Sequence, residues 1–349
     1  MAIHLEVDGA YADMSFAPRL SAALDRVAAP DSYGEGPLIR ECEAALAKLL
    51  GKERAVLFPT GTLANMIGLD RLCGARARRV LMHPDSHVMN DTGDSLASVM
   101  GLTAIASKSQ GSGFSGDAVR AAAASAKTGK VAQSLGAICI ETPVRRRRNE
   151  AFPADLLADT IATARQLKIG LHLDGARLPI AAAVAGKTMA EFSADYDTVY
   201  MSLWKMFGLP FGAVLAGPVG LLDGIEHDRR RLGGALPQLW PIAAVVLAEI
   251  GRLEPDWRRS LEWRDLFMRG ISSADGPEAI PAGDFPTNCI WLQPKSDVTT
   301  FKARCQEAGL ILGDINGERV LIRANPTLLG TLPEEVARRF VELDSSRML

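Results

Sequence analysis

The chain has 349 residues, of which 48% are apolar and 23% are charged, and its formal net charge is −2. This length and composition fit a globular protein of roughly two domains with a large core. A charge so close to zero gives no electrostatic reason to expect nucleic acid or an anionic membrane as a partner.

The five cysteines are scattered along the chain and lack CxxC spacing. Their pattern favours a reduced, cytoplasmic protein over a disulfide scaffold. The opening MAIHLEVDGAYADM carries acids and no apolar core, so we expect no signal peptide. No uncharged apolar run reaches the roughly 18 residues that a membrane-spanning helix needs.

The first segment of the chain, residues 1–50, ends in a predicted amphipathic helix. Gly34-Glu35-Gly36-Pro37 is typical of a turn before a helix. One face of that helix is apolar and consists of Leu38, Cys42, Leu46, Leu49 and Leu50.

A short apolar strand is predicted at Arg54–Pro59, followed by Thr60-Gly61-Thr62 at the start of a helix. Glycine permits close backbone approach, threonine can cap a helix, and the N–H groups at a helix start attract phosphate. Gly61 and Thr62 are therefore candidates for a phosphate cradle, although many strand-to-helix turns have a similar sequence.

The next strand and loop, RRVLMHPDSHVMNDTGD, contain His83 and His87. A histidine at this place can stack on a bound ring, or it can cap or pair with Asp85 or Asp91. The residues alone leave both interpretations open, and Asp91 and Thr92 are further candidates for a pocket wall.

A buried strand is predicted at Leu135–Glu141, and four arginines, Arg145–Arg148, follow shortly after it. Such a run can bind nucleic acid. No aromatic platform or wider basic face accompanies it, however, so a solvated loop or an interface patch is the favoured interpretation.

Two strand ends in the middle of the chain carry the most specific signal. His172 and Asp174 share one face of the predicted strand Gly170–Asp174. Lys205 follows the next strand, Asp197–Leu203, in a glycine-rich turn. Taken singly, each of these residues is more often part of a structural ion pair. Together, a carboxylate and an amine at neighbouring strand ends suit pyridoxal 5′-phosphate (PLP), because the lysine can form a Schiff base and the aspartate can hold the pyridine nitrogen protonated.

Strand-like and helix-like segments alternate from about residue 54 to 218, which predicts an α/β fold with a mostly parallel sheet between helices. From about residue 255 a polar helix, two strands (Asn288–Leu292 and Arg319–Ala324) and a last helix predict a small α+β domain. The expected division is an N-terminal arm of residues 1–50, a large domain of 51–254 and a C-terminal domain of 255–349.

Several of these segments resemble the threonine aldolase (β-eliminating lyase) family of fold-type I PLP-dependent enzymes. HLDGAR and SLWKMFGLPFGAVLAGP resemble its cofactor-aspartate and Schiff-base motifs, and DSYGEGP resembles its opening motif. Thr60–Asn65 resembles its Ser/Thr-Gly-Thr-x-x-Asn signature. The resemblance extends over almost the whole chain and implies a divergent member. It also implies a homodimer or homotetramer, with the N-terminal arm at the subunit interface.

The resemblance implies a role for individual residues. The catalytic set is Lys205, which carries the Schiff base, His87, which stacks on the pyridine ring, and Asp174. The cofactor-binding set is Gly61, Thr62, His87, Asp174, Arg177, Lys205 and Arg230, of which Arg230 crosses the dimer interface to the phosphate. The substrate-binding set is Arg177, Arg323 and Tyr33, with Arg323 as the arginine that grips the substrate carboxylate. No metal is expected.

Three departures from the family pattern bear on the substrate. Val144 stands where threonine aldolases have a histidine near the β-hydroxyl of the substrate, and Trp204 stands where the residue before the lysine is usually serine. The family's Arg-Ser-Asp-Thr segment reads LEVDGAY here, so no site residue is assigned to it. The base that takes the hydroxyl proton is left open between His87, His83 and a water molecule.

The implied reaction is cleavage of the Cα–Cβ bond of a β-hydroxy amino acid, which gives glycine and an aldehyde. β-Elimination, racemisation or transamination of another amino acid are alternatives that keep the cofactor. A PLP-binding protein without efficient turnover and an interaction module without cofactor are two further classes.

Overall fold

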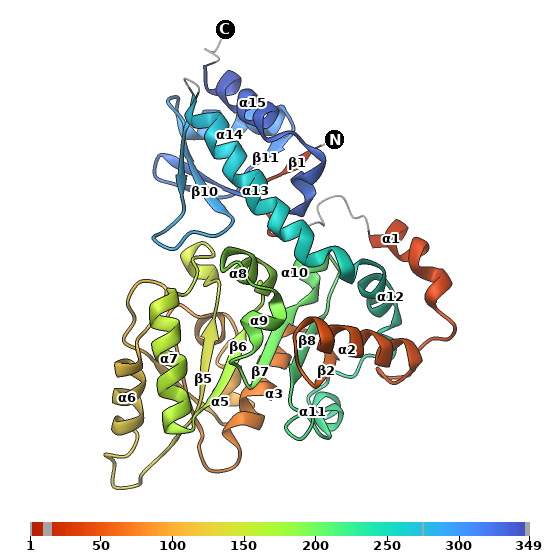
Figure 1. Ribbon diagram of the computed structural model, residues 1–349, viewed down its shortest axis with the longest axis vertical. Coiled ribbons are helices and arrows are strands. Elements are labelled where there is room, and N and C mark those ends of the chain that lie inside the picture. Colours follow the sequence, from red (N-terminus) through yellow and green to blue (C-terminus); the bar gives the residue numbers. More distant parts are fainter. Residues whose placement is uncertain (1, 10–15, 274–275, 346–349) are drawn as a thin grey trace.

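The computed structural model describes residues 2–9, 16–273 and 276–345, and shows a large domain with a small domain above it (Figure 1). A seven-stranded sheet forms the centre of the large domain, in the order β2-β8-β7-β6-β5-β3-β4. Its strands are β2 (Arg54–Phe58), β3 (Arg79–Met82), β4 (Thr103–Ala106), β5 (Leu135–Glu141), β6 (Gly170–Asp174), β7 (Thr198–Ser202) and β8 (Ala213–Gly217). Only β8 runs antiparallel to its neighbours, which confirms the expected mostly parallel sheet.

Helices cover both faces of this sheet. On one face, α3 (Gly61–Cys73) packs across β5 to β8. On the other face, Leu171 and Leu173 of β6 join a core with residues from several helices. These helices are α2 (Pro37–Leu49), α7 (Ala154–Leu167), α8 (Leu178–Val184), α9 (Met189–Ser193) and α12 (Trp240–Glu249). The alternation predicted for β6, with His172 and Asp174 on one side and the two leucines on the other, is confirmed.

Helix α13 (Leu253–Ser272) connects the two domains. Leu253 and Trp257 near its start are part of the large-domain core, whereas Trp263, Phe267 and Ile271 belong to the core of the small domain. A boundary at residue 255 therefore falls inside a continuous helix, and the division of the chain at that residue stays a prediction.

The small domain contains an antiparallel sheet in the order β12-β13-β10-β9, with α14 (Val298–Glu307) and α15 (Pro333–Ser345) packed against it. Its strands are β9 (Glu278–Pro281), β10 (Cys289–Gln293), β12 (Ile315–Asn316) and β13 (Arg319–Arg323). The sequence predicted only β10 and β13. It missed β9, which is partly exposed and ends in proline, and β12, which has two residues.

The beginning of the chain also packs against the small domain. Strand β1 (Ile3–His4) pairs in parallel with β11 (Leu310–Ile311), and Leu5 is part of the small-domain core. Helix α1 (Phe16–Ala23) packs instead on α12 of the large domain. The described parts of residues 1–50 thus contact both domains of their own chain.

The remaining elements are short connections: η1 (Leu24–Arg26), α4 (His87–Asn90), α5 (Ser95–Ser98), η2 (Arg145–Arg147), α10 (Leu203–Phe207), α11 (Ile225–Arg231), η3 (Ile250–Arg252) and η4 (Pro326–Gly330), together with α6 (Gly116–Ser125), which packs on α7. Within the described ranges, no helix has both the length and the apolar character to cross a membrane. All five cysteines are buried free thiols.

Candidate active site

The carboxyl ends of β5, β6 and β7 bring three side chains into a row. Glu141 is the register partner of Asp174, and Asp174 is the register partner of Tyr200. All three are buried and lie on the face of the sheet that α3 covers. Ligands of open α/β sheets bind at this carboxyl edge, so the row marks a candidate site.

A buried chain of hydrogen bonds fixes Asp174 from behind. Asn65 on α3 donates from Nδ2 to Asp174 Oδ2 over 2.9 Å, and its Oδ1 lies 2.9 Å from His172 Nε2. The other ring nitrogen of His172 lies 2.8 Å from Thr198 Oγ1. Since Asn65 Oδ1 can only accept, Nε2 of His172 carries the proton and Nδ1 accepts from the threonine hydroxyl. Burial lowers the pKa of His172 to about 3, so the ring is neutral and the chain positions Asp174 without adding charge.

Lys205 lies in the same recess as this row. The sequence predicted a turn here, but residues 203–207 form the short helix α10, which Ser202 caps by accepting from the backbone N–H of Lys205. Burial, and next the positive charge of Arg177, lower the pKa of the Lys205 amine to about 8. The recess is lined by His87, Glu141, Arg145, Asp174, Ala176, Arg177, Tyr200 and Lys205.

Trp204, the residue that replaces serine before the lysine, is 42% exposed. Lys205 Nζ lies 5.3 Å from the centroid of its ring. This geometry allows a cation–π contact when the lysine is charged.

The two histidines of the loop after β3 have different surroundings. His87 begins α4 and lines the recess, and its backbone N–H donates to Glu141 Oε2 over 2.5 Å. Burial lowers its pKa, so the neutral ring is favoured. His83 is buried outside the recess; its Nε2 lies 3.0 Å from the Gly111 carbonyl oxygen and its Nδ1 accepts from the backbone N–H of Asp85. Both nitrogens of His83 are thus engaged, which removes it as a candidate base.

Arg177 and Arg323 meet at one carboxylate that sequence reasoning left out. Nε of Arg177 donates to Asp8 Oδ2 over 2.6 Å, and Nε of Arg323 lies 3.4 Å from Asp8 Oδ1. Asn149 donates to the same carboxylate over 2.7 Å. Burial alone would raise the pKa of Asp8, but the charges of Arg177 and Arg323 outweigh it and lower the pKa. Arg177 lines the recess, whereas Arg323 stands behind Asp8.

Gly61 lies at the start of α3, where Thr60 caps the helix. A Cβ atom at residue 61 would come within 1.9 Å of the Tyr200 hydroxyl, so only glycine allows Tyr200 to line the recess as it does. Thr62 follows in the first helical turn, where the N–H groups have no partner within the helix and can bind an anion.

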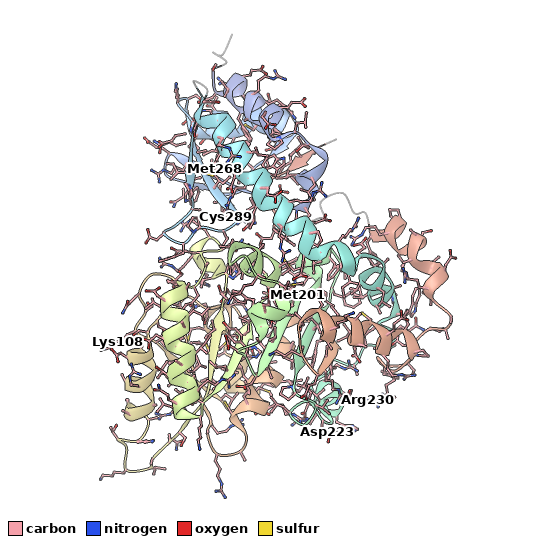
Figure 2. All side chains as sticks on the ribbon, viewed as in Figure 1. Lys108, Met201, Asp223, Arg230, Met268 and Cys289 are labelled. Carbon is pink, nitrogen blue, oxygen red and sulfur yellow. The ribbon has the colours of Figure 1, made fainter. Side chains whose placement is uncertain are left out.

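Tyr33 and Arg230 pair with each other and do not line the recess of their own chain. The Arg230 guanidinium carbon lies 4.7 Å from the Tyr33 ring centroid, and both residues are exposed. Figure 2 shows Arg230 on α11, at the end of the large domain that is remote from the small domain. The neighbouring Arg229 is buried and donates to the carbonyl oxygens of Leu57 and Tyr33. This buried arginine supports the segment that presents Tyr33 and Arg230 at the surface.

The loop after β5 replaces the family's histidine by a buried valine. Val144 is fully buried and pairs with Glu150, so its side chain does not reach the recess. Arg145 and Arg146 both bond to Asp91, which takes Asp91 out of the pocket wall. Thr92 donates to the Val88 carbonyl oxygen and does not line the recess either.

Sequence reasoning did not assign Glu141, Arg145, Ala176 or Tyr200 to the site, although all four line the recess, and it left out Asp8, which binds Arg177 from outside the recess. Burial, and next the charge of Asp174, raise the pKa of Glu141 to about 7, and its two oxygens accept from the backbone N–H groups of His87 and Arg145. An acidic residue that ends a fully apolar strand was the available signal for Glu141. Asp8 is 169 residues away from Arg177 in the sequence, and no local pattern links them.

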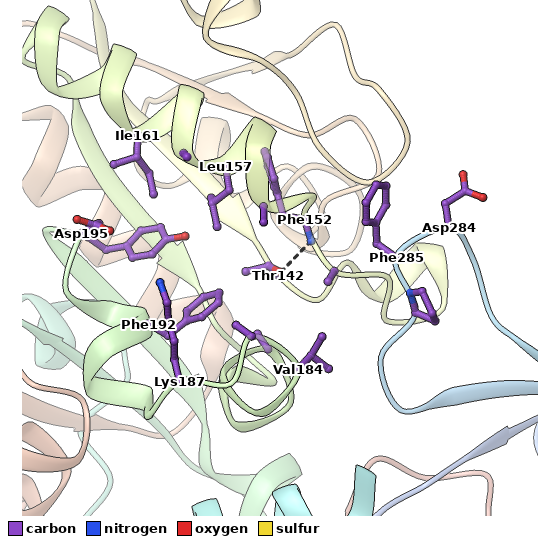
Figure 3. Close-up of a pocket in the computed structure, with 17 residues that line it drawn as sticks. Thr142, Phe152, Leu157, Ile161, Val184, Lys187, Phe192, Asp195, Asp284 and Phe285 are labelled. Carbon is purple, nitrogen blue, oxygen red and sulfur yellow. Dashed lines mark hydrogen bonds between the residues drawn. The ribbon is translucent and has the colours of Figure 1, made fainter. Parts of the chain in front are cut away.

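A larger cavity of about 510 Å³ lies between α7, α8, α9 and residues 284–286 of the small domain (Figure 3). Leu157, Ile161 and Phe192 point into it and make its lining apolar. Thr142 accepts a hydrogen bond from the backbone N–H of Phe152 at its wall (Figure 3). None of the predicted site residues lines this cavity, so the smaller recess at Lys205 remains the candidate active site.

Among the described residues, no group of histidine, cysteine and acidic side chains is arranged to hold a metal.

Comparison with known proteins identifies the family. Residues 20–283 match the β-eliminating lyase family, and the chain belongs to that family. A low-specificity L-threonine aldolase 1 of Arabidopsis thaliana is 25% identical over 84% of this chain and 83% of its own length.

Two solved structures share the fold. A protein of Listeria monocytogenes described as a putative L-allo-threonine aldolase has a TM-score of 0.76 and 23% identity, over 97% of this chain and 96% of that one. A serine palmitoyltransferase of S. paucimobilis with a bound PLP-myriocin aldimine has a TM-score of 0.70 and 15% identity, over 98% of this chain and 87% of that one. The predicted family and the predicted fold class are both confirmed.

Proposed function

We propose that this protein is a PLP-dependent aldehyde-lyase that cleaves the Cα–Cβ bond of a β-hydroxy amino acid to glycine and an aldehyde. The observation that carries the proposal is one recess in which an amine of lowered pKa, Lys205, faces a carboxylate, Asp174, that a buried chain of hydrogen bonds fixes in place. The similarity to a threonine aldolase over most of both chains supports it.

The residues of the recess fit PLP. The neutral form of Lys205 is accessible near neutral pH and can form the Schiff base, and the Asp174 side chain, fixed by Asn65, suits the pyridine nitrogen of the cofactor. Gly61, which allows the close approach of Tyr200, and Thr62 stand at a helix start that suits the phosphate. When bound there, PLP would supply an electron sink for the pair of electrons that leaves the Cα–Cβ bond.

The chain's own residues would do the remaining work. Arg177 would hold the substrate carboxylate in one orientation, which aligns the bond to be broken. Arg323 would support Arg177 through Asp8, which both arginines contact. His87, neutral because burial lowers its pKa, would take the proton from the β-hydroxyl, either directly or through water.

We further propose that the site is completed in a homodimer or homotetramer. Tyr33 and Arg230 form a stacked pair on the surface of their own chain, which is compatible with a role at the recess of a second copy. The five buried, unbonded thiols agree with a cytoplasmic location.

β-Elimination is the second candidate function. It is favoured by the buried Val144, because the loop that carries the hydroxyl-side histidine in threonine aldolases brings no such base to the recess here. Racemisation and transamination use the same cofactor, and a PLP-binding protein without efficient turnover would keep the recess as well.

Glycine release from a panel of L- and D-β-hydroxy amino acids, with PLP added, tests the proposal. Glycine together with the matching aldehyde from at least one member is the expected result. PLP bound at Lys205 without glycine from any member would reject cleavage, and pyruvate or another keto acid from serine-like substrates would then indicate elimination.

A further inference from the structure

The loop after β5 brings a positive charge to the mouth of the recess that the proposed reaction on threonine does not use. Arg145 lines the recess together with His87 and Lys205. Its backbone N–H is held by Glu141 Oε1 at 2.9 Å, and the other oxygen of Glu141 holds the backbone N–H of His87. A single buried carboxyl group thus fixes Arg145 beside the residue proposed as the base.

Two arginines share one acid at this place. Nη2 of Arg145 lies 2.5 Å from Asp91 Oδ2, and Nη2 of Arg146 lies 2.7 Å from Asp91 Oδ1. The neighbouring acids Asp85 and Glu150 both pair with Arg147. The three arginines of this cluster and its three acids balance in charge, and the side chains of Arg145 and Arg146 are 42% and 43% exposed and can reach a ligand. A ligand carboxylate can therefore take the place of Asp91 at Arg145 while Arg146 keeps Asp91 paired.

The same charge pattern occurs at the neighbouring strand end. Arg177 and Arg323 share Asp8, as Arg145 and Arg146 share Asp91. Arg177 follows β6 and Arg145 follows β5, and these two strands are paired side by side. The recess therefore has guanidinium groups at two separate places, Arg177 and Arg145, and each can bind a carboxylate.

The positive charge of Arg145 also acts on His87 inside the recess. Burial is the largest cause that lowers the pKa of His87, and the charges of Lys205 and then of Arg145 lower it further. An anion bound at Arg145 would offset this effect at the proposed base.

We infer that the preferred substrate carries a second carboxylate on its β-carbon, as 3-hydroxyaspartate does, and that Arg145 is the residue that selects it. This inference rests on the proposed function for its reaction. The Cα–Cβ bond breaks, the β-hydroxyl loses its proton as its C–O bond becomes a carbonyl, and Cα gains a proton. One molecule of 3-hydroxyaspartate thus gives one glycine and one glyoxylate, with no other reactant.

The test compares kcat/KM for 3-hydroxyaspartate and threonine in the PLP-loaded enzyme. We expect the wild type to prefer the dicarboxylic substrate at least about tenfold, and Arg145→Gln to reduce this preference about tenfold or more, as loss of a hydrogen bond to a charged group does. Arg145→Lys keeps the charge without the planar fork and should retain part of the preference. Arg338→Gln is the matched control, because Arg338 lies in an exposed ion pair with Glu342 on α15 and does not line the recess, and it should keep the preference within about threefold. Equal kcat/KM values for the two substrates, with a ratio that Arg145→Gln does not change, would overturn the inference and leave the proposed lyase function standing.

A binding measurement separates this inference from the function. L-Aspartate and L-2-aminobutyrate lack the β-hydroxyl and differ by the second carboxylate, and their dissociation constants can be measured from the change in the absorbance of bound PLP. We expect aspartate to bind at least about tenfold more tightly and Arg145→Gln to remove that difference. If no β-hydroxy amino acid releases glycine, the lyase proposal fails while this binding result still decides the inference. Equal dissociation constants in the wild type would reject the role of Arg145.

Discussion

The floor and the rim of the recess are built in opposite ways. The floor consists of Asp174, Asn65, His172 and Thr198, which are all buried and form one chain of hydrogen bonds. The rim is Arg145, which lines the recess, together with the adjoining Arg146–Arg148, and the side chains of Arg145, Arg146 and Arg147 are partly exposed and held by ion pairs. Arg148 differs, since its guanidinium carbon lies 5.0 Å from the Trp291 ring centroid.

This difference indicates which part sets the chemistry and which part selects the substrate. A buried polar group without a partner is costly, so each member of the floor depends on the others and a change in one disturbs the whole. Exposed ion pairs contribute little to stability, so the rim can change its charges at small cost to the fold.

The largest effect is expected at the amine of Lys205, which lies in the same recess as Asp174. Lys205→Ala removes the nucleophile that would hold PLP, and we expect glycine release to fall by at least about a thousandfold. Activity is measured together with the absorbance of bound PLP. Turnover within about tenfold of the wild type would contradict the proposed role of the lysine and the proposed function with it.

Asn65→Ala tests the floor directly. The substitution removes the donor to Asp174 and the acceptor for His172, so we expect kcat/KM to fall about 10–100-fold, as it does when partners behind a functional group are lost. Asn316→Ala, in the exposed strand β12, is the matched control and should leave the rate unchanged. An effect no larger than that of the control would show that Asp174 does not depend on the chain behind it.

Much of the floor could be predicted from the sequence, because it depends on patterns within single strands and at their ends. The two-residue period of a strand put His172 and Asp174 on one face, and the ends of successive strands brought Lys205 close to them. The sequence did not predict that Asn65 lies between His172 and Asp174, because that contact depends on how α3 lies across the sheet.

The rim and the arginine pair could not be predicted in the same way. The bond between Asp8 and Arg177 joins the segment after β1 to the turn after β6, and the two guanidiniums on Asp91 come from a run that was interpreted as a solvated loop or an interface patch. These contacts join charged side chains of unrelated elements, which leave no periodic signal in the sequence.

Asp8→Asn tests whether that unpredicted contact matters. Asparagine keeps the shape and removes the charge that Arg177 and Arg323 share, so Arg177 should lose its fixed orientation. We expect KM for the amino acid substrate to rise about tenfold with a smaller change in kcat, and the free energy of unfolding to fall by about 3 kcal/mol, because a largely buried pair is broken. Steady-state kinetics and urea unfolding measure the two effects. An unchanged KM would show that Asp8 serves only the fold.

The pH dependence of cofactor capture tests the environment of Lys205. Since the pKa of its amine is lowered to about 8, the neutral, reactive form should increase roughly tenfold per pH unit below that value and level off above it. The rate at which the apoprotein binds PLP, followed by absorbance, should show this profile. Arg177→Gln removes a positive charge that lowers the pKa, so the midpoint should move to higher pH. A midpoint above pH 10 in the wild type would contradict the burial of the amine.

The smallest effect is expected at the rim, where the contrast with the floor is sharpest. Arg146→Gln removes one of the two guanidiniums from Asp91, and the exposed Arg145 remains to pair with that carboxylate. We expect the free energy of unfolding to fall by less than about 1 kcal/mol, and the difference from the wild type to shrink further as salt screens the exposed charges. Urea unfolding at low and high ionic strength measures both. A loss as large as that expected for Asp8→Asn would mean that the rim is part of the structural core of the site, and then a substrate carboxylate could not exchange with Asp91 at Arg145 without disturbing the fold. A small loss leaves Arg145 able to exchange one carboxylate for another, which the proposed selection of a dicarboxylic substrate requires.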